Sequence, residues 1–590
     1  MKNHPLLRGN KKSITLQDSY KTFTRDQDKV ISPEETIQRF KERLAAAKLD
    51  ILREVRRIDN GRLDIPIYFS MCGKDAHATI GTKKQMGKGS SPEQSQASAC
   101  MELAERYSFF SFVKDPANFI VATHGELKKL DLPLLPLERL LQSVHDTTTT
   151  VFTLEKMLAN IPIQWTWATN LTRGTDVLVP FSWFYAINEF NGPSAGNTCE
   201  EAINQGICEI VERHVCALIN RNHPKVPAID LTTVQDPVAR ELLQKFTSNG
   251  IELYLNDFSL DTGIPTVGAL AIDRSTFPAK SEIVYTAGTT PGAEKALIRA
   301  LTEVAQLAGD FNSGSNYVAS GLPKPLAMAE VAYITNPGVT VAMAALPDLS
   351  DPNMKVEIER CVEALKKLDM EVLLINTMHA DLKIPTLYTI IPGAHFRERS
   401  MLQNAGLFAA KLIAESDMGG AAINQRLIEL HDIVPDAYYL EFYLGRNLLA
   451  MGRHDEALAR FRQATKLHPE DEDMPYIHSY LGHCLKDMER YEEAILELEK
   501  GLALDDERPD MHNALGVCHF KQQEYEAAIR HFQRAVELAP ASAIDYANLG
   551  INYQKLGQGG EAVRNFEIAL ALDPTIDWAR GLLAELTASA

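Results

Sequence analysis

The last quarter of the chain repeats one pattern, and this repetition constrains the fold more than any other feature of the sequence. In the two clearest copies, five residues recur about 34 positions apart: Gly516, Ala528, Phe532, Ala535 and Pro540, then Gly550, Ala562, Phe566, Ala569 and Pro574. Two earlier copies read Gly482, Ala494, Leu498 and Gly501, and Gly445, Ala457, Phe461, Ala464 and Pro469. Such a period predicts stacked pairs of helices that approach at the small residues, enclose the aromatic residue and end at the proline.

This pattern resembles the tetratricopeptide repeat (TPR), which implies an all-α superhelix. The four repeats cover about residues 437–576, and the final WARGLLAELTASA is expected to form a capping helix. A Gly pair, a helical run and a Pro in SDMGGAAINQRLIELHDIVPDA predict a domain boundary near residue 420. We therefore expect a flexible, polar N-terminus over residues 1–28, one domain over residues 29–420, and the repeat domain over residues 421–590.

The domain over residues 29–420 alternates β-rich and helical segments, which predicts a mixed α/β architecture. The β-rich segments are residues 65–72, 177–185, 265–273 and 372–377. With 45 % hydrophobic and 23 % charged residues, the chain has the composition of an ordinary globular protein.

Charge and cysteine content narrow the classes of function. A net charge of −18 repels polyphosphate backbones, so a nucleic-acid partner is not expected. The eight cysteines form no C-x-x-C pair, which favours a reducing cytoplasm. The N-terminal residues lack a signal-peptide core, and no run of about 18 apolar residues occurs, so we expect neither export nor a membrane span.

Three helical segments each combine a narrow polar stripe with an otherwise apolar surface. Helical spacing of about 100° per residue places the members of each stripe within about 60° to 80°. The stripes are Ser98, Glu102 and Glu105; then Glu201, Gln205, Glu209, Glu212 and Cys216; and Arg299, Glu303 and Gln306.

A single stripe of this kind is more often a solvated face with i, i+4 pairs. Three stripes on helices apolar elsewhere favour a shared buried site, because clustered carboxylates repel one another unless cations neutralise them. Hard oxygen ligands suit Mg²⁺, which often bridges phosphates, and Arg299, Gln205 and Ser98 are suitable phosphate or nucleobase contacts. These residues predict a Mg-nucleotide site.

The sequence lacks a standard phosphate-binding P-loop. Its nearest candidate, GTKKQMGKGS, has five rather than four residues between Gly81 and Gly87, and Gly89 stands where Ser or Thr is required. This stretch is either a turn that lets backbone approach a ligand or a plain strand-to-helix loop. An H-E-x-x-H zinc motif is also absent.

Three segments resemble the signature motifs of the YcaO family, in the family's order: GKGSSPEQSQASACMELAERYS, SAGNTCEEAINQGICEIVERH and ALIRALTEVAQ. The resemblance runs over about residues 30–405 and is closest to standalone bacterial YcaO proteins with a helical C-terminal domain. It implies an α+β YcaO-type domain that binds ATP without a P-loop, through Mg²⁺ held by glutamates.

The resemblance also implies roles for individual residues, although it identifies no catalytic residue. Implied Mg²⁺ ligands are Glu102, Glu105, Glu209, Glu212 and Glu303; implied ATP contacts are Lys29, Thr36, Ser98, Asn197, Gln205 and Arg299. Thr36 departs mildly from the family pattern, which has Ser at that position.

Members of the family phosphorylate a peptide backbone amide on its oxygen, and a nucleophile then replaces the phosphate. A Cys, Ser or Thr side chain gives an azoline ring, whereas external sulfide gives a thioamide. Ring-forming members commonly end in a Pro-rich tail, but this chain ends LLAELTASA, so thioamide formation is the favoured outcome.

The repeats are expected to recruit a peptide or protein substrate or a partner such as a sulfide-delivery protein, and the resemblance suggests a homodimer. Two alternatives remain open. One is a non-catalytic ATP-binding accessory or scaffold factor, such as one supporting methylthiolation of a ribosomal protein. The other is an azoline-forming cyclodehydratase.

Overall fold

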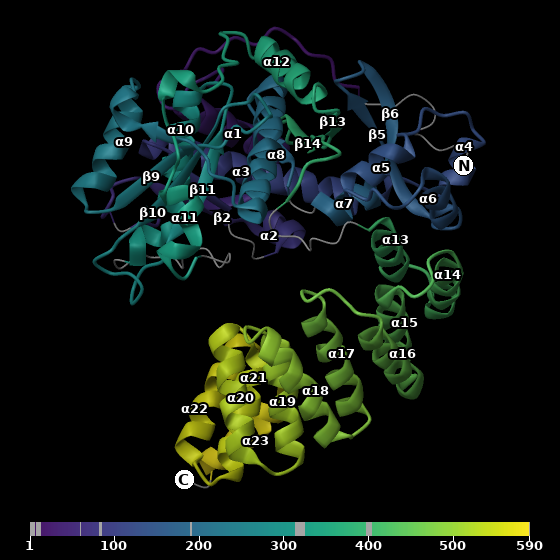
Figure 1. The fold of residues 1–590 in the computed structure, drawn as a ribbon. Helices are drawn as coiled ribbons and strands as arrows, with labels where there is room; N and C mark the ends of the chain where they lie inside the picture. Colours follow the sequence, from purple (N-terminus) through teal and green to yellow (C-terminus); the bar gives the residue numbers. More distant parts are fainter. Residues whose placement is uncertain are drawn as a thin grey trace. The chain divides into compact units, whose positions relative to one another are not determined.

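The chain folds into two compact units in a computed structural model that describes residues 6, 13–59, 61–81, 85–188, 191–312, 325–396 and 404–588. The first unit comprises residues 1–151 and 162–399, and the second comprises residues 152–161 and 400–590. The boundary expected near residue 420 thus lies within the second unit. Figure 1 shows the elements of both units.

The first unit contains three β-sheets. In order, the three-stranded sheet has β1 (Leu52–Arg57), β2 (Ile67–Cys72) and β3 (Gln85–Lys88); the five-stranded sheet has β11 (Val284–Thr289), β10 (Thr266–Ile272), β9 (Glu252–Asp257), β8 (Ala228–Asp230) and β12 (Thr340–Ala342). The six-stranded sheet has β4 (Ile120–Ala122), β5 (Ile163–Asn170), β13 (Leu373–Asn376), β14 (Thr386–Ile390) and β7 (Pro193–Ala195), with β6 (Thr175–Pro180) paired to β5. Among the described strands, only β8 and β12 pair in parallel.

Helices pack between and around these sheets, which confirms the mixed α/β prediction. They are α1 (Pro33–Ala47), α2 (Lys74–Ile80), α3 (Pro92–Lys114), α4 (His124–Lys128), α5 (Leu137–Ser143), α7 (Phe181–Asn188), α8 (Cys199–Asn222), α9 (Pro237–Ser248), α10 (Ala293–Ala308), α11 (Ala332–Thr335) and α12 (Met354–Lys366). In Figure 1, α1, α3 and α8 lie centrally, between the strands β9 to β11 and the strands β5, β6, β13 and β14.

The long central helices begin at capping residues that the sequence supplies. Ser91 Oγ accepts a hydrogen bond from Gln94 N at the start of α3, where Pro92 occupies the first turn. Thr198 Oγ1 accepts one from Glu201 N at the start of α8. These caps fix where each helix starts and therefore which turns reach the interior.

One predicted strand differs from the structure. The segment 177–185 is a strand only as far as Pro180, and α7 begins at Phe181. Phe181 packs against Phe119 with ring centroids 4.8 Å apart, and Trp183 Nε1 donates a hydrogen bond to Ser143 Oγ. The periodicity of a short apolar run does not distinguish a strand from a buried helix, so tertiary packing determines which of the two forms.

The N-terminal segment also differs from expectation. Residues 1–28 were expected to be flexible, but residues 13–28 make specific hydrogen bonds to the body of the first unit. Residues 1–5 and 7–12 lie outside the described residues. Gln17 N donates to Glu200 Oε1 at 2.7 Å, and Ser19 N donates to Asn353 Oδ1 at 3.0 Å. The polar composition of this segment suggested flexibility. The segment is ordered instead because its polar side chains and backbone form hydrogen bonds to buried partners.

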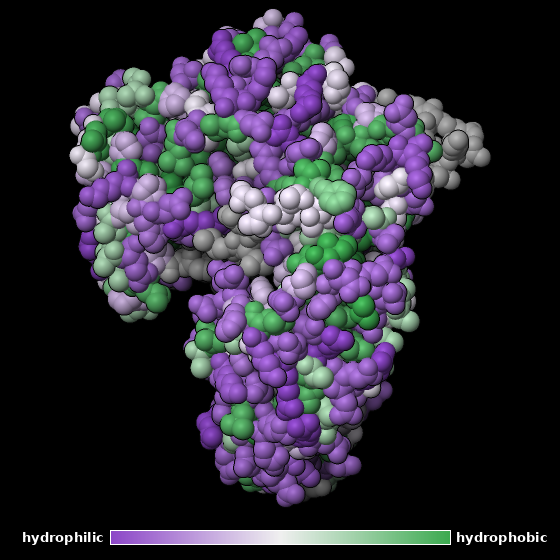
Figure 2. All heavy atoms as spheres, turned by 45° about the vertical axis from the view of Figure 1, so that its right-hand side comes forward, coloured by the Kyte–Doolittle hydropathy of each residue, from purple (hydrophilic) through white to green (hydrophobic). Residues whose placement is uncertain are grey.

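The second unit is all-helical. Its helices are α6 (Val151–Leu158), α13 (Ala405–Ala414), α14 (Gly420–Ile433), α15 (Tyr438–Ala450), α16 (His454–Lys466), α17 (Met474–Asp487), α18 (Tyr491–Leu504), α19 (Pro509–Lys521), α20 (Tyr525–Leu538), α21 (Ala543–Lys555), α22 (Gly559–Leu572) and α23 (Asp577–Ala588). Helices α15 to α22 form four successive pairs, and α23 follows the last one, as the repeat pattern predicts. On the face drawn in Figure 2, the surface of these repeats is mostly hydrophilic.

The repeated Gly position meets the Phe position inside three of the helix pairs, and meets Leu498 in the pair α17–α18. A Cβ added to Gly516 would lie 2.7 Å from Phe532, and one added to Gly550 would lie 2.6 Å from Phe566. Only glycine allows this approach, because real Cβ atoms essentially never come so close. Across the described residues of both units, no helix is long and apolar enough to cross a membrane.

Candidate nucleotide and metal site

The three polar stripes meet at one cavity of the first unit, with a volume of about 280 Å³. It is enclosed by α3, α8 and α10, with contributions from β3, α1 and the chain before α1. Ten of the eleven residues assigned from sequence line it: Lys29, Thr36, Ser98, Glu102, Glu105, Asn197, Gln205, Glu209, Arg299 and Glu303.

The remaining surface of each helix is buried in the core, as the stripes predict. Cys100 and Leu103 of α3, Ile207 of α8, and Leu297 and Leu301 of α10 are all fully inaccessible to solvent. Apolar packing on these sides leaves the polar stripes facing the cavity. Its polar lining therefore follows directly from the sequence pattern.

Glu212 is the exception, because it lies behind the cavity rather than on its wall. Its Oε2 atom accepts hydrogen bonds from Arg299 Nε at 2.9 Å and from Thr289 N at 3.0 Å. Burial would raise the pKa of Glu212, but Arg299 and Arg213 outweigh that effect and hold it below the ordinary value. In this arrangement the carboxylate orients Arg299 toward the cavity.

Basic side chains that were not assigned from sequence also line the cavity: Lys88, Arg106 and Arg213. Lys88 contacts Glu303, and Arg106 Nε lies 3.5 Å from Glu105 Oε1. Together with Lys29 and Arg299, these side chains make five basic groups near six glutamates. Glu212 lies behind the cavity wall, and the other five glutamates line it, at positions 102, 105, 201, 209 and 303. Basic side chains therefore supply much of the neutralisation that sequence reasoning attributed to divalent cations alone.

The cavity favours the neutral forms of several charged groups. Burial raises the pKa of Glu102 and raises that of Glu105 well above its ordinary value. Burial, aided by repulsion from Arg299, lowers the pKa of Lys88 to about 7. A cation placed against these carboxylates would stabilise their charged forms, so the donor set suits an incoming divalent ion.

The residues fit Mg²⁺ by donor type, because glutamate oxygens from two facing helices reach one space. In the part of the chain that the structure describes, no three His, Cys, Asp or Glu side chains are gathered closely enough to hold one ion. Glu102 and Glu105 pair with Arg106 instead, and Glu303 pairs with Lys88. Binding an ion would require these basic groups to move to other partners, for which phosphate oxygens are suited.

Glu201 joins the end of the N-terminal segment to the start of α8. Its carboxylate lies 3.6 Å from Lys29 Nζ and accepts hydrogen bonds from Val30 N and from Asn197 Nδ2. Asn197 Nδ2 also donates to Thr36 Oγ1 at 3.0 Å. Glu201 belonged to the second sequence stripe, and this contact with Lys29 could not be seen from helical spacing.

Within the glycine-rich stretch before α3, residues 85–88 form β3, which packs on that helix. A Cβ on Gly87 would lie 2.1 Å from Ser95 O, and Ser95 Oγ donates to Gly87 O at 2.8 Å. The glycine thus permits close contact between β3 and α3, which carries Lys88 into the cavity. Residues 82–84 of this stretch lie outside the described residues.

Family models match both parts of the chain. The model described as YcaO cyclodehydratase, ATP- and Mg²⁺-binding, matches residues 86–395, more than half of the chain. The chain therefore belongs to the YcaO family. A tetratricopeptide-repeat model matches residues 442–485 and 481–543, so the protein combines a YcaO domain with C-terminal TPR repeats.

Two curated relatives are similar over the YcaO portion. An uncharacterized protein of Methanothermobacter thermautotrophicus is 27% identical over 386 residues, which are 62% of this chain and 94% of that protein. An uncharacterized protein in the tfuA 3′ region of Rhizobium leguminosarum bv. trifolii is 26% identical over 293 residues, 46% of this chain and 65% of that protein.

Two solved structures share the fold. One is YcaO from Methanopyrus kandleri bound with AMPPCP and Mg²⁺, with a TM-score of 0.50 and 21% identity over 64% of this chain and 94% of that chain. The other is a heterocyclase in complex with substrate and cofactor, with a TM-score of 0.52 and 23% identity over 67% of this chain. The match spans 56% of the heterocyclase, so nearly half of that chain has no counterpart here.

Proposed function

We propose that the protein uses Mg-ATP to phosphorylate the oxygen of a peptide or protein backbone amide, and that a sulfur nucleophile then displaces the phosphate to form a thioamide. The observation that carries this proposal is the single cavity in which acidic stripes of α3 and α8 face Arg299 of α10. Membership of an ATP- and Mg²⁺-binding family supports it.

The lining residues divide by chemistry into two groups. Glu102, Glu105 and Glu209 would hold Mg²⁺ through carboxylate oxygens. Arg299 and Lys88 would contact phosphate oxygens, with Glu212 fixing the orientation of Arg299. When bound, the metal ion would offset the negative charge that builds up on the transferring phosphoryl group.

The reaction balances with ATP and a sulfide donor as co-reactants. The amide oxygen bonds to the γ-phosphorus as the bond to ADP breaks, and the amide proton leaves the nitrogen. Hydrosulfide then adds to the amide carbon, and the carbon–oxygen bond breaks to release phosphate. Proton transfer back to nitrogen leaves the thioamide, with ADP and phosphate as by-products.

In this proposal the TPR repeats recruit the substrate or a partner protein. Stacked helix pairs provide an extended surface for a peptide or helix. Residues 401–590 contain 31 acidic and 17 basic residues, and so carry −14 of the total charge of −18. This charge favours a basic binding partner, because attraction between opposite charges increases encounter rates and suppresses binding of like-charged partners.

Ring closure is the second candidate, because the matching family model is described as a cyclodehydratase. Mass spectrometry of a peptide treated with the protein, ATP and sulfide separates the two reactions. Replacement of oxygen by sulfur adds mass, whereas cyclodehydration removes water. A dehydrated product formed without sulfide would refute thioamide formation and establish the azoline reaction.

Calorimetric titration with Mg-ATP tests the metal assignment. Replacing Glu102 or Glu209 by Gln removes a metal ligand but keeps the side-chain shape, so ATP binding at a fixed, low Mg²⁺ concentration should fall below detection. Glu93→Gln, on the same helix α3 but outside the cavity, is the matched control and should bind as the parent does. Unchanged ATP affinity in both cavity variants would refute the metal site.

A further inference from the structure

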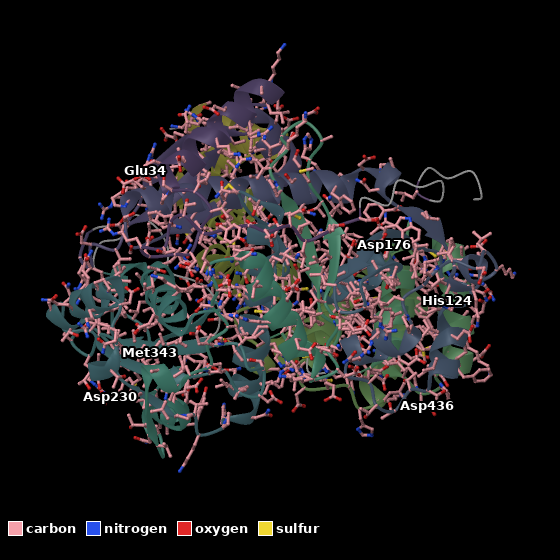
Figure 3. The ribbon with its side chains drawn as sticks, turned by 90° about the horizontal axis from the view of Figure 1, so that it is seen from above. Glu34, His124, Asp176, Asp230, Met343 and Asp436 are labelled. Atoms are coloured by element: carbon pink, nitrogen blue, oxygen red, sulfur yellow. The ribbon has the colours of Figure 1, made fainter. Side chains whose placement is uncertain are left out.

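The N-terminal strap, defined here as residues 13–31, runs from the six-stranded sheet to the nucleotide cavity. It starts where Ser13 Oγ donates to Asp176 of β6, a residue that Figure 3 labels. It ends in Gln27 and Lys29, which line the cavity wall. The second half of the strap therefore contributes the side chains of Gln27 and Lys29 to the cavity. The first half is bonded elsewhere in the unit, to residues such as Glu200 and Asn353.

Lys21 anchors the middle of the strap in the protein interior. Its Nζ atom lies 2.7 Å from Asp28 Oδ2 and 2.5 Å from Glu357 Oε1, and its side chain is only 5% exposed. Glu357 of α12 is completely buried and also accepts hydrogen bonds from Asn204 Nδ2 of α8 and from Asp351 N. Lys21 therefore ties the strap to the junction of α8 and α12.

The strap turns back on itself directly after Lys21. Phe23 N donates to Lys29 O at 3.1 Å, and Lys29 N donates to Phe23 O at 2.8 Å. At the far end of this turn, Ser90 Oγ donates to the buried Asp26 at 2.7 Å. Contacts at both ends therefore determine where Lys29 lies.

We propose that Lys21 is a positioning residue of the nucleotide site, which acts through Asp28 and the turn to hold Lys29 and Gln27 against the cavity. This inference rests on the proposed function, since it takes Mg-ATP as the ligand. Burying a lysine and a glutamate is costly unless both are well paired. Lys21 meets that condition, does not line the cavity, and directly bonds the residue next to Lys29.

Lys21→Met tests the proposal, because it removes the charge and keeps the length of the side chain. We expect Mg-ATP affinity to fall at least tenfold, with a rise in KM for ATP that exceeds any fall in kcat. Without nucleotide, hydrogen exchange at the amides of Phe23 and Lys29 should speed up more than elsewhere in the unit. Unchanged exchange at these amides would overturn the proposal.

A double variant separates positioning from general stability. Lys21→Met leaves Glu357 buried without its cation, so it should also lower thermal stability. Adding Glu357→Gln removes the unpaired charge and should restore stability while ATP affinity stays low. Affinity that recovers together with stability would show that the ion pair acts only through folding. Lys21→Arg keeps the positive charge that pairs with Asp28 and Glu357, so its Mg-ATP affinity should stay within about threefold of the parent's.

Arg62→Met is the matched control, because Arg62 also pairs with a buried carboxylate of the first unit, Asp273, at 2.7 Å and away from the cavity. It should lower stability without changing ATP affinity. An equal loss of affinity in Arg62→Met would overturn the positioning role. If the parent protein binds no Mg-ATP, the proposed function fails; if the parent binds and Lys21→Met binds equally well, only this inference fails.

Discussion

Glu212 and Glu209 lie one helical turn apart on α8, yet the structure gives them different partners. Glu209 faces the cavity, whereas Glu212 bonds to Arg299 and to Thr289 N. We therefore expect Glu209→Gln to raise the Mg²⁺ concentration needed for ATP binding, and Glu212→Gln to weaken ATP binding without changing that concentration. Mg²⁺ titrations at fixed ATP measure this difference. An equal shift in both variants would make Glu212 a metal ligand.

Arg299 offers a second test at the same scale. Arg299→Lys keeps the positive charge but loses the planar group that bonds to Glu212 and can also reach phosphate. We expect kcat/KM for Mg-ATP to fall about tenfold or more, as measured by phosphate release. Parental turnover in this variant would refute the assignment of Arg299 as a phosphate contact.

Helical spacing identified the polar side chains that α3, α8 and α10 contribute to the cavity, because it specifies the direction in which a side chain points. Helical spacing does not specify whether a side chain reaches the cavity or lies behind the residues that line it. For this reason Glu212 was placed beside Glu209, although Glu212 lies behind the cavity wall. Lys88 and Arg106 were missed for another reason. Lys88 of β3 contacts Glu303 of α10, and Arg106 contacts Glu105 on the same helix α3. The periodicity of a single segment does not reveal such contacts.

Among the elements, the helix pairs of the repeats depend on their glycines. Gly516→Ala would place a Cβ 2.7 Å from Phe532, so we expect the second unit to lose about 1–3 kcal/mol of stability in urea unfolding. Gly581→Ala in α23 is the control, because no atom lies within 4 Å of its added Cβ. It should stabilise that helix by about 0.5–1 kcal/mol. Similar losses in both variants would contradict the packing explanation.

Acid should weaken the contact between α17 and α18. A hydrogen bond from His478 lowers the pKa of Glu497 to about 2, from about 4.3 for a free glutamate. Because the folded-state pKa is depressed, the contact stabilises the repeats above about pH 4.3 and is lost as the pH falls toward 2. Thermal unfolding between pH 5 and 2.5 measures this loss. Glu497→Gln should show less pH dependence; a parental pH profile would contradict the assignment.

The elements themselves were predictable where their pattern was long or repeated. Four copies of Gly and an apolar partner defined the helix pairs, and three long helices with polar stripes defined the centre of the first unit. The short segment 177–185 was not predictable, because the aromatic cluster that makes Phe181 begin a helix comes from distant parts of the chain. The strap was missed because its partners are distant in the sequence: Glu200 lies 183 residues from Gln17, and Asn353 lies 334 residues from Ser19.

For the whole molecule, charge distribution makes a prediction about recruitment. The repeats carry most of the net negative charge, so binding of a basic partner should weaken as salt screens the attraction. Raising the ionic strength from about 0.05 to 0.5 M should lower the affinity for such a partner, measured by surface plasmon resonance. ATP affinity should change less, because the acidic and basic side chains that line the cavity nearly balance. A partner whose binding strengthens with salt would show that apolar contacts dominate.

Removing the repeats should separate nucleotide binding from recruitment. Every residue that lines the cavity belongs to the first unit, so a chain ending at residue 434, after α14, should bind Mg-ATP with parental affinity. The same chain should show a raised KM for any peptide or protein that the full protein modifies, because the recruiting surface is gone. Circular dichroism confirms that the first unit is folded. Loss of ATP binding by a folded truncated chain would show that the repeats contribute to the nucleotide site itself.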